Sequence, residues 1–271
     1  MSSEASQLIS TVSYEHITVT TEDEFAIVTM CRAKSRNSLS EDHLLELTSA
    51  FEAIAQSDAR GVVIAAEGPV FSSGHDFKDM IGRDLDEMTR LLQVCGDFMQ
   101  LIQRMPQPVI AQIEGIATAA GCQLAASCDL AVAGESTQFQ TPGGRGGWFC
   151  HTPGVALARA VGRKHALEML FTGDPIDAQT ALAWGLVNRV VPDSDVAAET
   201  RELLRRATAG TRAAKAKGKE IFYRQVDLDV SGAYEVATEA MAETSQWPDA
   251  QERIKAFIEK RPPRYEEPDE T

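Results

Sequence analysis

Residues 109–133, VIAQIEGIATAAGCQLAASCDLAVA, hold the pattern that decides the fold. The stretch begins with an apolar run at 109–113, continues through small residues at 117–126, and ends with a second apolar run at 130–133. Short apolar runs bounded by turn residues are typical of strands buried on both faces, and small residues let a helix pack closely against them. The stretch therefore predicts a strand–helix–strand unit of the parallel type.

The same alternation extends toward the N-terminus. Residues 17–20 and 26–30 flank a Glu-Asp-Glu turn and predict a β-hairpin. A helix is expected next, because Ser40 is a good N-cap and apolar residues follow it at helical spacing. The apolar run 61–66 predicts a buried strand, and a second long helix is expected to end before Pro106. Strands that alternate with helices indicate an α/β fold with a parallel sheet.

The chain changes character after Pro192, where two Ala-rich, helical stretches follow the α/β part. We therefore divide the chain near residue 200, into residues 1–200 and a helical region at 201–271. The helical region carries many Lys and Arg side chains, a pattern that favours a solvated helix face over a docking surface for phosphates. These basic residues are Arg201, Arg205, Arg206, Arg212, Lys215, Lys217, Lys219 and Arg224.

Composition excludes several classes of function. The net charge of −14 is opposite in sign to the basic surface that nucleic-acid-binding proteins carry. No apolar run approaches the ~20 residues of a membrane-spanning helix, and the five His residues never pair at metal-ligand spacing. Residues 1–10 hold no Lys or Arg and no apolar signal core, and the five cysteines form no CxxC pair, which together favour a reduced, cytoplasmic protein. Cys122 and Cys128 are expected in the core.

Two segments combine a strand end, a glycine-bearing turn and a helix start: residues 71–78, FSSGHDFK, and residues 115–124, GIATAAGCQL. Each presents free backbone N–H groups at a helix N-terminus, where the helix dipole favours negative charge. Two such donors that converge on one point would form an oxyanion hole for an enolate or a tetrahedral intermediate. Taken singly, each turn also fits a purely structural role, with Asp76 as a helix cap.

Together, the two segments resemble the crotonase, or enoyl-CoA hydratase/isomerase, superfamily. This resemblance covers nearly the whole chain and implies an α/β fold, a crotonase-like ββα spiral followed by a C-terminal helical region that builds homotrimers, commonly paired into hexamers. Finer features at 73–76, 119–124 and 149–159 resemble one branch of that family. The matching segments are 32–40 (a CoA-contacting loop), 71–80 (FxAGxDxKxM), 115–133 (GxAxGGGxxLxxxCDxxxA) and 167–186 (LxMLxTGxxxxAxxAxxxGL).

The resemblance also implies a binding site for the thioester of an acyl-CoA, with no prosthetic group and no metal. The backbone N–H groups of His75 and Ala120 would hold the thioester carbonyl, and the imidazole of His75 is an alternative acid or base. Some of the CoA contacts would come from a neighbouring subunit. The expected CoA contacts, besides His75 and Ala120, are Arg36, Asp76, Phe77, Lys78, Phe257 and Lys260.

The chain departs from the family at both catalytic carboxylates. Family hydratases place one Glu where this chain has Gln123, and a second Glu directly after a Pro, where this chain has Gly143. An amide does not titrate and Gly has no side chain, so neither residue can transfer a proton, and each loss costs ~10²–10⁴ in rate. Standard hydration is therefore expected to be weak or absent. Gln123 retains the ability to orient a water or a carbonyl through hydrogen bonds.

Three functions stay open from the sequence. The first is an acyl-CoA enzyme that stabilises a thioester enolate, and the second is a non-catalytic acyl-CoA-binding or regulatory protein. The third is thioester hydrolysis through Cys150 and His151, which is disfavoured because adjacent residues of an extended chain point to opposite sides. Glu114 and Arg145 are the remaining candidates for polar groups at the acyl site.

Overall fold

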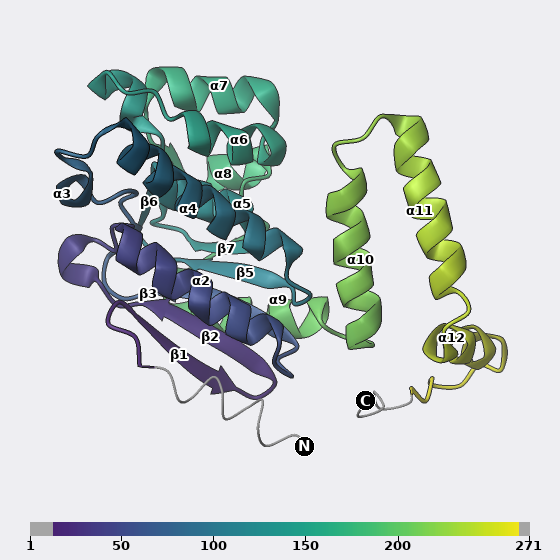
Figure 1. The fold of residues 1–271 in the computed structure, drawn as a ribbon. Coiled ribbons are helices and arrows are strands. Elements are labelled where there is room, and N and C mark those ends of the chain that lie inside the picture. The colour runs from purple at the N-terminus through teal and green to yellow at the C-terminus, as the bar shows by residue number, and fades with distance from the viewer. Residues whose placement is uncertain (1–12, 266–271) are drawn as a thin grey trace.

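The structure is a computed structural model that describes residues 13–265. The N-terminal segment 1–10, from which a location was predicted, lies outside the described residues. Within 13–265, two sheets and their helices form the body of the molecule, and three helices near the C-terminus extend from it (Figure 1). No helix in this range combines the length and the apolar character needed to cross a membrane.

The larger sheet has six strands within the described residues, in the order β1-β2-β3-β5-β7-β10. β1 and β2 form the antiparallel hairpin expected near the N-terminus, and the remaining neighbours pair in parallel. The apolar runs 61–66, 109–113 and 130–133 all lie in this sheet, which confirms the α/β prediction. The strands are β1 (Ile17–Glu22), β2 (Phe25–Met30), β3 (Gly61–Ala66), β5 (Val109–Ile113), β7 (Leu130–Gly134) and β10 (Arg189–Val191).

A smaller sheet lies beside it, with four short strands among residues 13–265 in the order β4-β6-β8-β9. β4, β6 and β8 each follow a strand of the larger sheet and lead toward a helix, so the chain repeats a ββα unit and the predicted spiral is confirmed. The small-residue stretch 117–126 is not helical throughout, because Ala117 and Thr118 belong to β6. The strands are β4 (Val70–Ser72), β6 (Ile116–Thr118), β8 (Gln138–Gln140) and β9 (Ile176–Asp177).

Helices cover both faces of the larger sheet. α2 (Glu41–Ala55) and α4 (Leu85–Arg104) lie side by side in front of it, with the rings of Phe51 and Phe98 edge to face at 5.1 Å. α9 (Val196–Ala207) packs against β3, β5 and β7 on the other face. The Ser40 side chain accepts a hydrogen bond from the His43 N–H and so caps α2 as expected. The remaining body helices are α3 (Phe77–Met80), α5 (Ala120–Ser127), α6 (His151–Ala160), α7 (Gly162–Thr172) and α8 (Ala178–Trp184).

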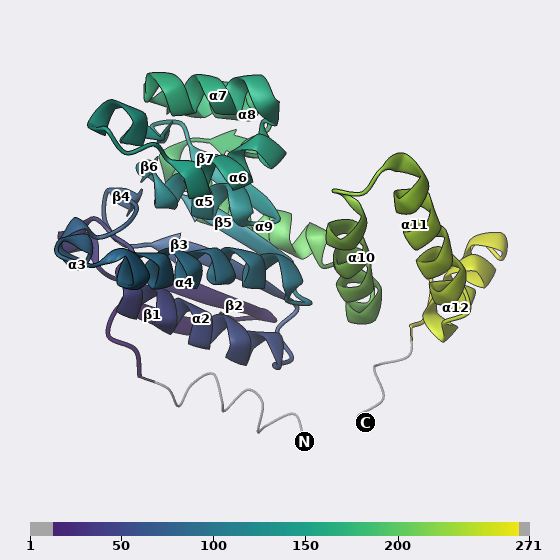
Figure 2. The same ribbon diagram turned by 45° about the horizontal axis from the view of Figure 1, so that its top comes forward.

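The last three helices of the described chain leave the body one after another. α10 (Arg212–Gln225) packs against α4, whereas α11 (Val230–Thr244) and α12 (Pro248–Ile258) lie beyond α10 on the side away from the body (Figures 1 and 2). α9 continues through residue 200 and packs on the larger sheet, so the chain leaves the body only after Ala207. The division into two domains stays a prediction.

A buried polar cluster fastens α10 to the body. Lys219 Nζ donates to Asp129 Oδ2 at 2.6 Å and to the carbonyls of Ile102 and Gln107 at 2.7 and 2.8 Å. The Tyr223 hydroxyl donates to the other oxygen of Asp129 at 2.8 Å. The side chain of Lys219 is only 7% exposed, so the expectation of a solvated basic face is wrong for this residue. We call Asp129, Lys219 and Tyr223 the α10 anchor.

Candidate active site

The first glycine-bearing turn follows β4 and runs alongside the loop that precedes α2. Leu39 N donates to the Gly74 carbonyl at 2.8 Å, and Asp76 N donates to the Leu39 carbonyl at 3.2 Å. In this parallel bridge both bonds flank His75, so the N–H of His75 itself points away from Leu39. The turn therefore presents one free backbone donor on the side opposite the loop.

Asp76 is the helix cap that the sequence predicts. Its carboxylate accepts from the Lys78 N–H at 3.1 Å, from the Ser38 hydroxyl at 2.9 Å and from Arg32 at 3.1 Å. Burial raises the pKa of Asp76, but these hydrogen bonds outweigh it and leave the pKa below its ordinary value. The ionised side chain thus connects the 32–40 loop to the turn through hydrogen bonds. These bonds assign it a structural role and not one in proton transfer.

The second turn joins β6 to α5 through an unusual backbone conformation. Ala119 has φ 52° and ψ −119°, and its N–H donates to the Gln140 carbonyl at 2.9 Å. Positive φ is uncommon for a residue with a Cβ and stores strain. Ala120 follows as the first residue of α5, where an N–H group has no partner within its own helix.

The two turns touch without a side chain between them. A Cβ built on Gly74 would lie 3.0 Å from Ala120 N and 2.8 Å from the Cβ of Ala119. A Cβ on Gly121 would lie only 2.3 Å from the Ser72 carbonyl oxygen. Within residues 13–265, neither the His75 N–H nor the Ala120 N–H donates a hydrogen bond. The structure therefore brings together the two amide donors that the sequence analysis selected.

Replacing Ala119 by Gly is expected to raise the free energy of unfolding by about 1 kcal/mol, because relief of the positive φ exceeds the entropy that glycine adds to the unfolded chain. Urea unfolding of the purified variant measures the change. Ala125→Gly is the matched control, since Ala125 is a buried residue of the regular part of α5 and should lose about 1 kcal/mol or more. An equal loss of unfolding free energy in the two variants would contradict backbone strain at Ala119.

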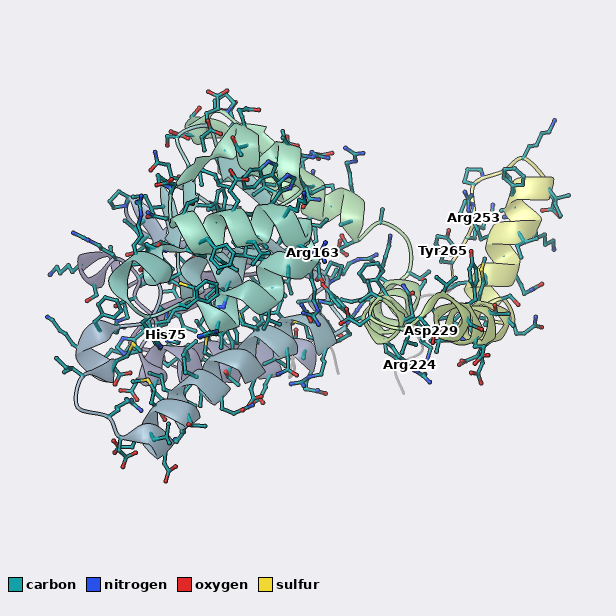
Figure 3. All side chains as sticks on the ribbon, turned by 90° about the horizontal axis from the view of Figure 1, so that it is seen from above. His75, Arg163, Arg224, Asp229, Arg253 and Tyr265 are labelled. Carbon is teal, nitrogen blue, oxygen red and sulfur yellow. The ribbon has the colours of Figure 1, made fainter. Side chains whose placement is uncertain are left out.

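The predicted CoA-contacting residues fall into two groups. Arg36 lies next to the first turn, because its carbonyl accepts from Ser73 N at 3.0 Å, and Lys78 and Phe77 stand exposed at the start of α3. Phe257 and Lys260 are on and just after α12, far from His75 in the same chain, as the separation of His75 from Arg253 shows (Figure 3). One chain therefore assembles only the first group.

Comparison with protein families gives a match to the enoyl-CoA hydratase/isomerase model over residues 20–268. The chain belongs to this family. Enoyl-CoA hydratase domain-containing protein 3, mitochondrial, of Rattus norvegicus is 46% identical over 244 residues, which is 89% of this chain and 81% of that protein. The human protein of the same name is 47% identical over 240 residues, or 87% and 78% of the two chains.

Solved structures of the family support the fold and the branch. The crystal structure of human enoyl-CoA hydratase domain-containing protein 3 superimposes with a TM-score of 0.89 at 44% identity, over 93% of this chain and 100% of that one. An enoyl-CoA hydratase of Mycobacterium smegmatis gives 0.90 at 43% identity, over 93% and 99%. The crotonase fold and the branch expected from the motifs at 73–76, 119–124 and 149–159 are thereby confirmed.

Gln123 and Gly143, the positions where the sequence predicts that catalytic carboxylates are missing, have different surroundings. Gln123 is 4% exposed on α5, and its Oε1 has no hydrogen-bond partner among residues 13–265. Gly143 lies in the 3₁₀ helix η2 (Pro142–Gly146), where a Cβ would meet the Trp148 carbonyl oxygen at 2.2 Å and Cys150 Sγ at 2.6 Å. Position 143 is therefore closed to any side chain while this loop keeps its path, a property that the sequence does not reveal.

Cys150 and His151 do not form a nucleophile and base. Cys150 is the N-cap of α6 and His151 is its first residue, so neither lies in an extended chain. The His151 ring packs on Phe149 with ring centroids 5.1 Å apart. Burial raises the pKa of the Cys150 thiol above its ordinary value, which disfavours the thiolate that would attack a thioester. No hydrogen bond joins the two side chains in the described part of the chain.

Glu114 and Arg145 are both engaged at the surface. Glu114 is exposed and accepts from Gln112 at 3.0 Å, and Gln112 in turn accepts from Arg201 of α9. Arg145 pairs with Asp174 at 2.7 Å with both side chains more than half exposed. The role of either residue at the acyl site therefore stays a prediction.

The imidazole of His75 is the remaining titratable group beside the turns. Its Nδ1 lies 3.4 Å from the Leu39 carbonyl, an acceptor, which places the proton of the neutral ring on Nδ1. Burial lowers the pKa of His75 below its ordinary value, so the ring is neutral at pH 7 and cannot serve as a general acid there. Its Nε2 is buried and makes no hydrogen bond within residues 13–265.

Sequence reasoning missed two buried hydroxyls at the second turn. Thr118 ends β6, and Thr141 follows β8, and the Oγ1 of each lacks a hydrogen-bond partner in the described chain. A lone threonine carries no motif signal, so only the fold could reveal them. Residues 13–265 hold no group of three or more His, Cys, Asp or Glu side chains arranged to bind a metal ion.

Proposed function

We propose that this protein binds acyl-CoA thioesters and stabilises their oxyanion, or enolate, form with the backbone N–H groups of His75 and Ala120. The close approach of the Gly74 and Gly121 turns supports this proposal, because it brings the segments of two unengaged amide donors together. Hydrogen bonds to the thioester oxygen would withdraw charge from the carbonyl and acidify the adjacent carbon.

Proton transfer after that step is limited, because the site offers few side chains that can accept or donate a proton. Neither Gln123 nor Gly143 can accept a proton, Asp76 is held in a cap, and burial disfavours the charged ring that His75 would become on accepting a proton. We therefore propose that two-carboxylate hydration of an enoyl-CoA is weak or absent. A non-catalytic acyl-CoA-binding role is the second candidate, and the closed position 143 favours it, because a second carboxylate cannot enter there.

Arg36 and Lys78 are proposed to contact the CoA phosphates at the mouth of the site, since both lie exposed beside the first turn. Phe257 and Lys260 would reach a CoA only from another subunit. α11 and α12 carry apolar side chains that are at least half exposed, as expected if a second copy covers them in a trimer or a hexamer. These side chains are Val230, Tyr234, Met241, Ile254, Phe257 and Ile258.

Calorimetric titration with a matched pair of ligands tests the oxyanion site. Butyryl-CoA should bind about tenfold more tightly than S-butyl-CoA, a thioether without the carbonyl, because two amide hydrogen bonds are worth about 1–2 kcal/mol in total. Absence of binding by any CoA derivative would overturn the proposal. Equal affinities would retain CoA binding and remove the oxyanion role.

Gly121→Ala supplies the structural arm of this test. The added Cβ would press on the Ser72 carbonyl oxygen and separate the two turns, so the preference for the thioester should fall toward one. Gly96→Ala on α4 is the matched control, because nothing lies within 4 Å of its Cβ position. A preserved preference in Gly121→Ala would contradict the assignment of the Ala120 amide.

The cellular compartment of this protein is the last point of the proposed function. The relatives reported above carry the word mitochondrial in their names, whereas the sequence analysis favoured the cytoplasm. We propose the mitochondrion as the compartment to test against the cytoplasm, by fractionation of cells that express the full-length chain.

A further inference from the structure

A partly buried arginine joins the loop before α2 to the first glycine-bearing turn. Arg32 Nη1 donates to the Ser38 carbonyl at 2.6 Å and to the Ser40 hydroxyl at 3.0 Å. Its Nη2 donates to Asp76 Oδ2 at 3.1 Å, and the two side chains of this ion pair are 18% and 15% exposed. One planar guanidinium therefore binds the loop, the N-cap of α2 and the N-cap of α3 at the same time.

Ser38 lies at the centre of these contacts and is 6% exposed. Its hydroxyl donates to Asp76 Oδ2 at 2.9 Å. Its carbonyl accepts from Arg32 and also lies 3.1 Å from Nδ1 of His43, a fully buried residue of α2. The peptide of Ser38 is thus fixed by charged and ring N–H groups instead of by strand or helix pairing.

The residue after Ser38 sets the orientation of one proposed oxyanion donor. Leu39 forms the two backbone hydrogen bonds that flank His75. The direction of the His75 N–H therefore depends on where the loop places Leu39. Donors of an oxyanion hole act only over a narrow range of geometry, so the groups that hold the loop control the strength of this donor.

We propose that Arg32 is a positioning residue of the oxyanion site, which directs the His75 N–H toward the thioester oxygen by fixing Ser38 and Asp76. This inference rests on the proposed function and adds to it a residue that acts through protein partners. The same loop carries Arg36, a proposed contact of the CoA phosphates. Arg32 thus keeps the phosphate contact and the thioester donor in one rigid frame.

Arg32→Gln and Arg83→Gln form a matched pair of variants. Arg83 is 16% exposed and binds Glu41 and Asp79 at 2.8 and 2.9 Å, so it resembles Arg32 in charge, burial and ion pairing. Within the described chain, however, Arg83 forms no hydrogen bond or ion pair with residues 36–39. Both variants should lower the melting temperature, and only the first should disturb the oxyanion site.

Calorimetry with butyryl-CoA and S-butyl-CoA measures that disturbance as a ratio of affinities, which cancels any loss of CoA affinity that the two ligands share. The ratio of about ten in the unaltered protein should fall to about two in Arg32→Gln and stay near ten in Arg83→Gln. An unchanged ratio in Arg32→Gln, or an equal fall in both variants, would overturn the inference and leave the proposed function intact. A ratio of one in the unaltered protein would overturn the proposed oxyanion role itself.

A milder pair of variants serves if Arg32→Gln does not fold. The hydroxyls of Ser38 and Ser57 are both buried, and they donate to Asp76 Oδ2 at 2.9 Å and to the Ile54 carbonyl at 2.8 Å. Ser38→Ala should lower the ratio about threefold, whereas Ser57→Ala should leave it unchanged. Equal ratios in these two variants would overturn the inference.

Discussion

Replacing Gln123 by Glu is expected to raise the rate of crotonyl-CoA hydration by about 10²–10⁴-fold, the contribution of one well-placed general base. The substitution changes an amide to a carboxylate of nearly the same size at a position that is 4% exposed. Loss of absorbance of the enoyl thioester follows the reaction directly.

Two further variants control this experiment. Gln123→Met has similar volume and no base, so it should show no gain. Gly143→Glu should also show no gain and should lose stability, because its Cβ would lie 2.2 Å from the Trp148 carbonyl oxygen. If Gln123→Glu stays inactive although butyryl-CoA still binds, the acyl chain does not pass Gln123, and the placement of the thioester at Ala120 is contradicted.

The different surroundings of Gln123 and Gly143 follow from tertiary structure. The sequence predicts that both residues stand where family hydratases carry a catalytic Glu, and neither residue has a titratable group. Only the fold shows that Trp148 and Cys150 have closed over Gly143, whereas Gln123 keeps a buried oxygen free. Gln123→Glu is therefore expected to introduce a general base. Gly143→Glu would require the loop around residue 143 to change its path.

The sequence predicts the long elements of this fold better than the short ones. The runs 61–66, 109–113 and 130–133 are apolar apart from Gln112 because they are largely buried on both faces, and the sequence predicts each as a strand. β4, β6 and β8 have three residues each and depend on pairing with one another. Three residues are too few for a period, so 117–126 was expected to be helical although it begins in β6.

The candidate site was predicted in its backbone and only partly in its side chains. Glycines at 74 and 121 signal close approach of two turns, and the structure shows that a Cβ at either position would collide with the opposite turn. Thr118 and Thr141 carry no such signal, because a lone threonine in the sequence does not show whether its hydroxyl will find a partner in the fold. Phe257 and Lys260 were expected at the CoA site, but within one chain α12 lies away from it.

Replacing Lys219 by Met is expected to lower the free energy of unfolding by about 3–5 kcal/mol, the cost of leaving a buried charge without its partner. Lys219 supplies the α10 anchor with one ion pair and two hydrogen bonds to carbonyls. Removal of the ammonium leaves Asp129 without an ionic partner among residues 13–265. Methionine fills a similar volume, so the loss reports charge and hydrogen bonding instead of packing. Urea unfolding gives the magnitude.

A neighbouring lysine on the same helix provides the control. Lys217 forms only a surface pair with Glu220 at 3.4 Å, so Lys217→Met should change the stability by less than about 1 kcal/mol. Adding Asp129→Asn to Lys219→Met should recover part of the loss, because the uncompensated charge is then gone while the amide oxygen still accepts from Val109 N and the amide nitrogen can donate to the Tyr223 hydroxyl. If Lys219→Met costs no more than Lys217→Met, α10 is held to the body by its apolar contacts and the anchor is incidental.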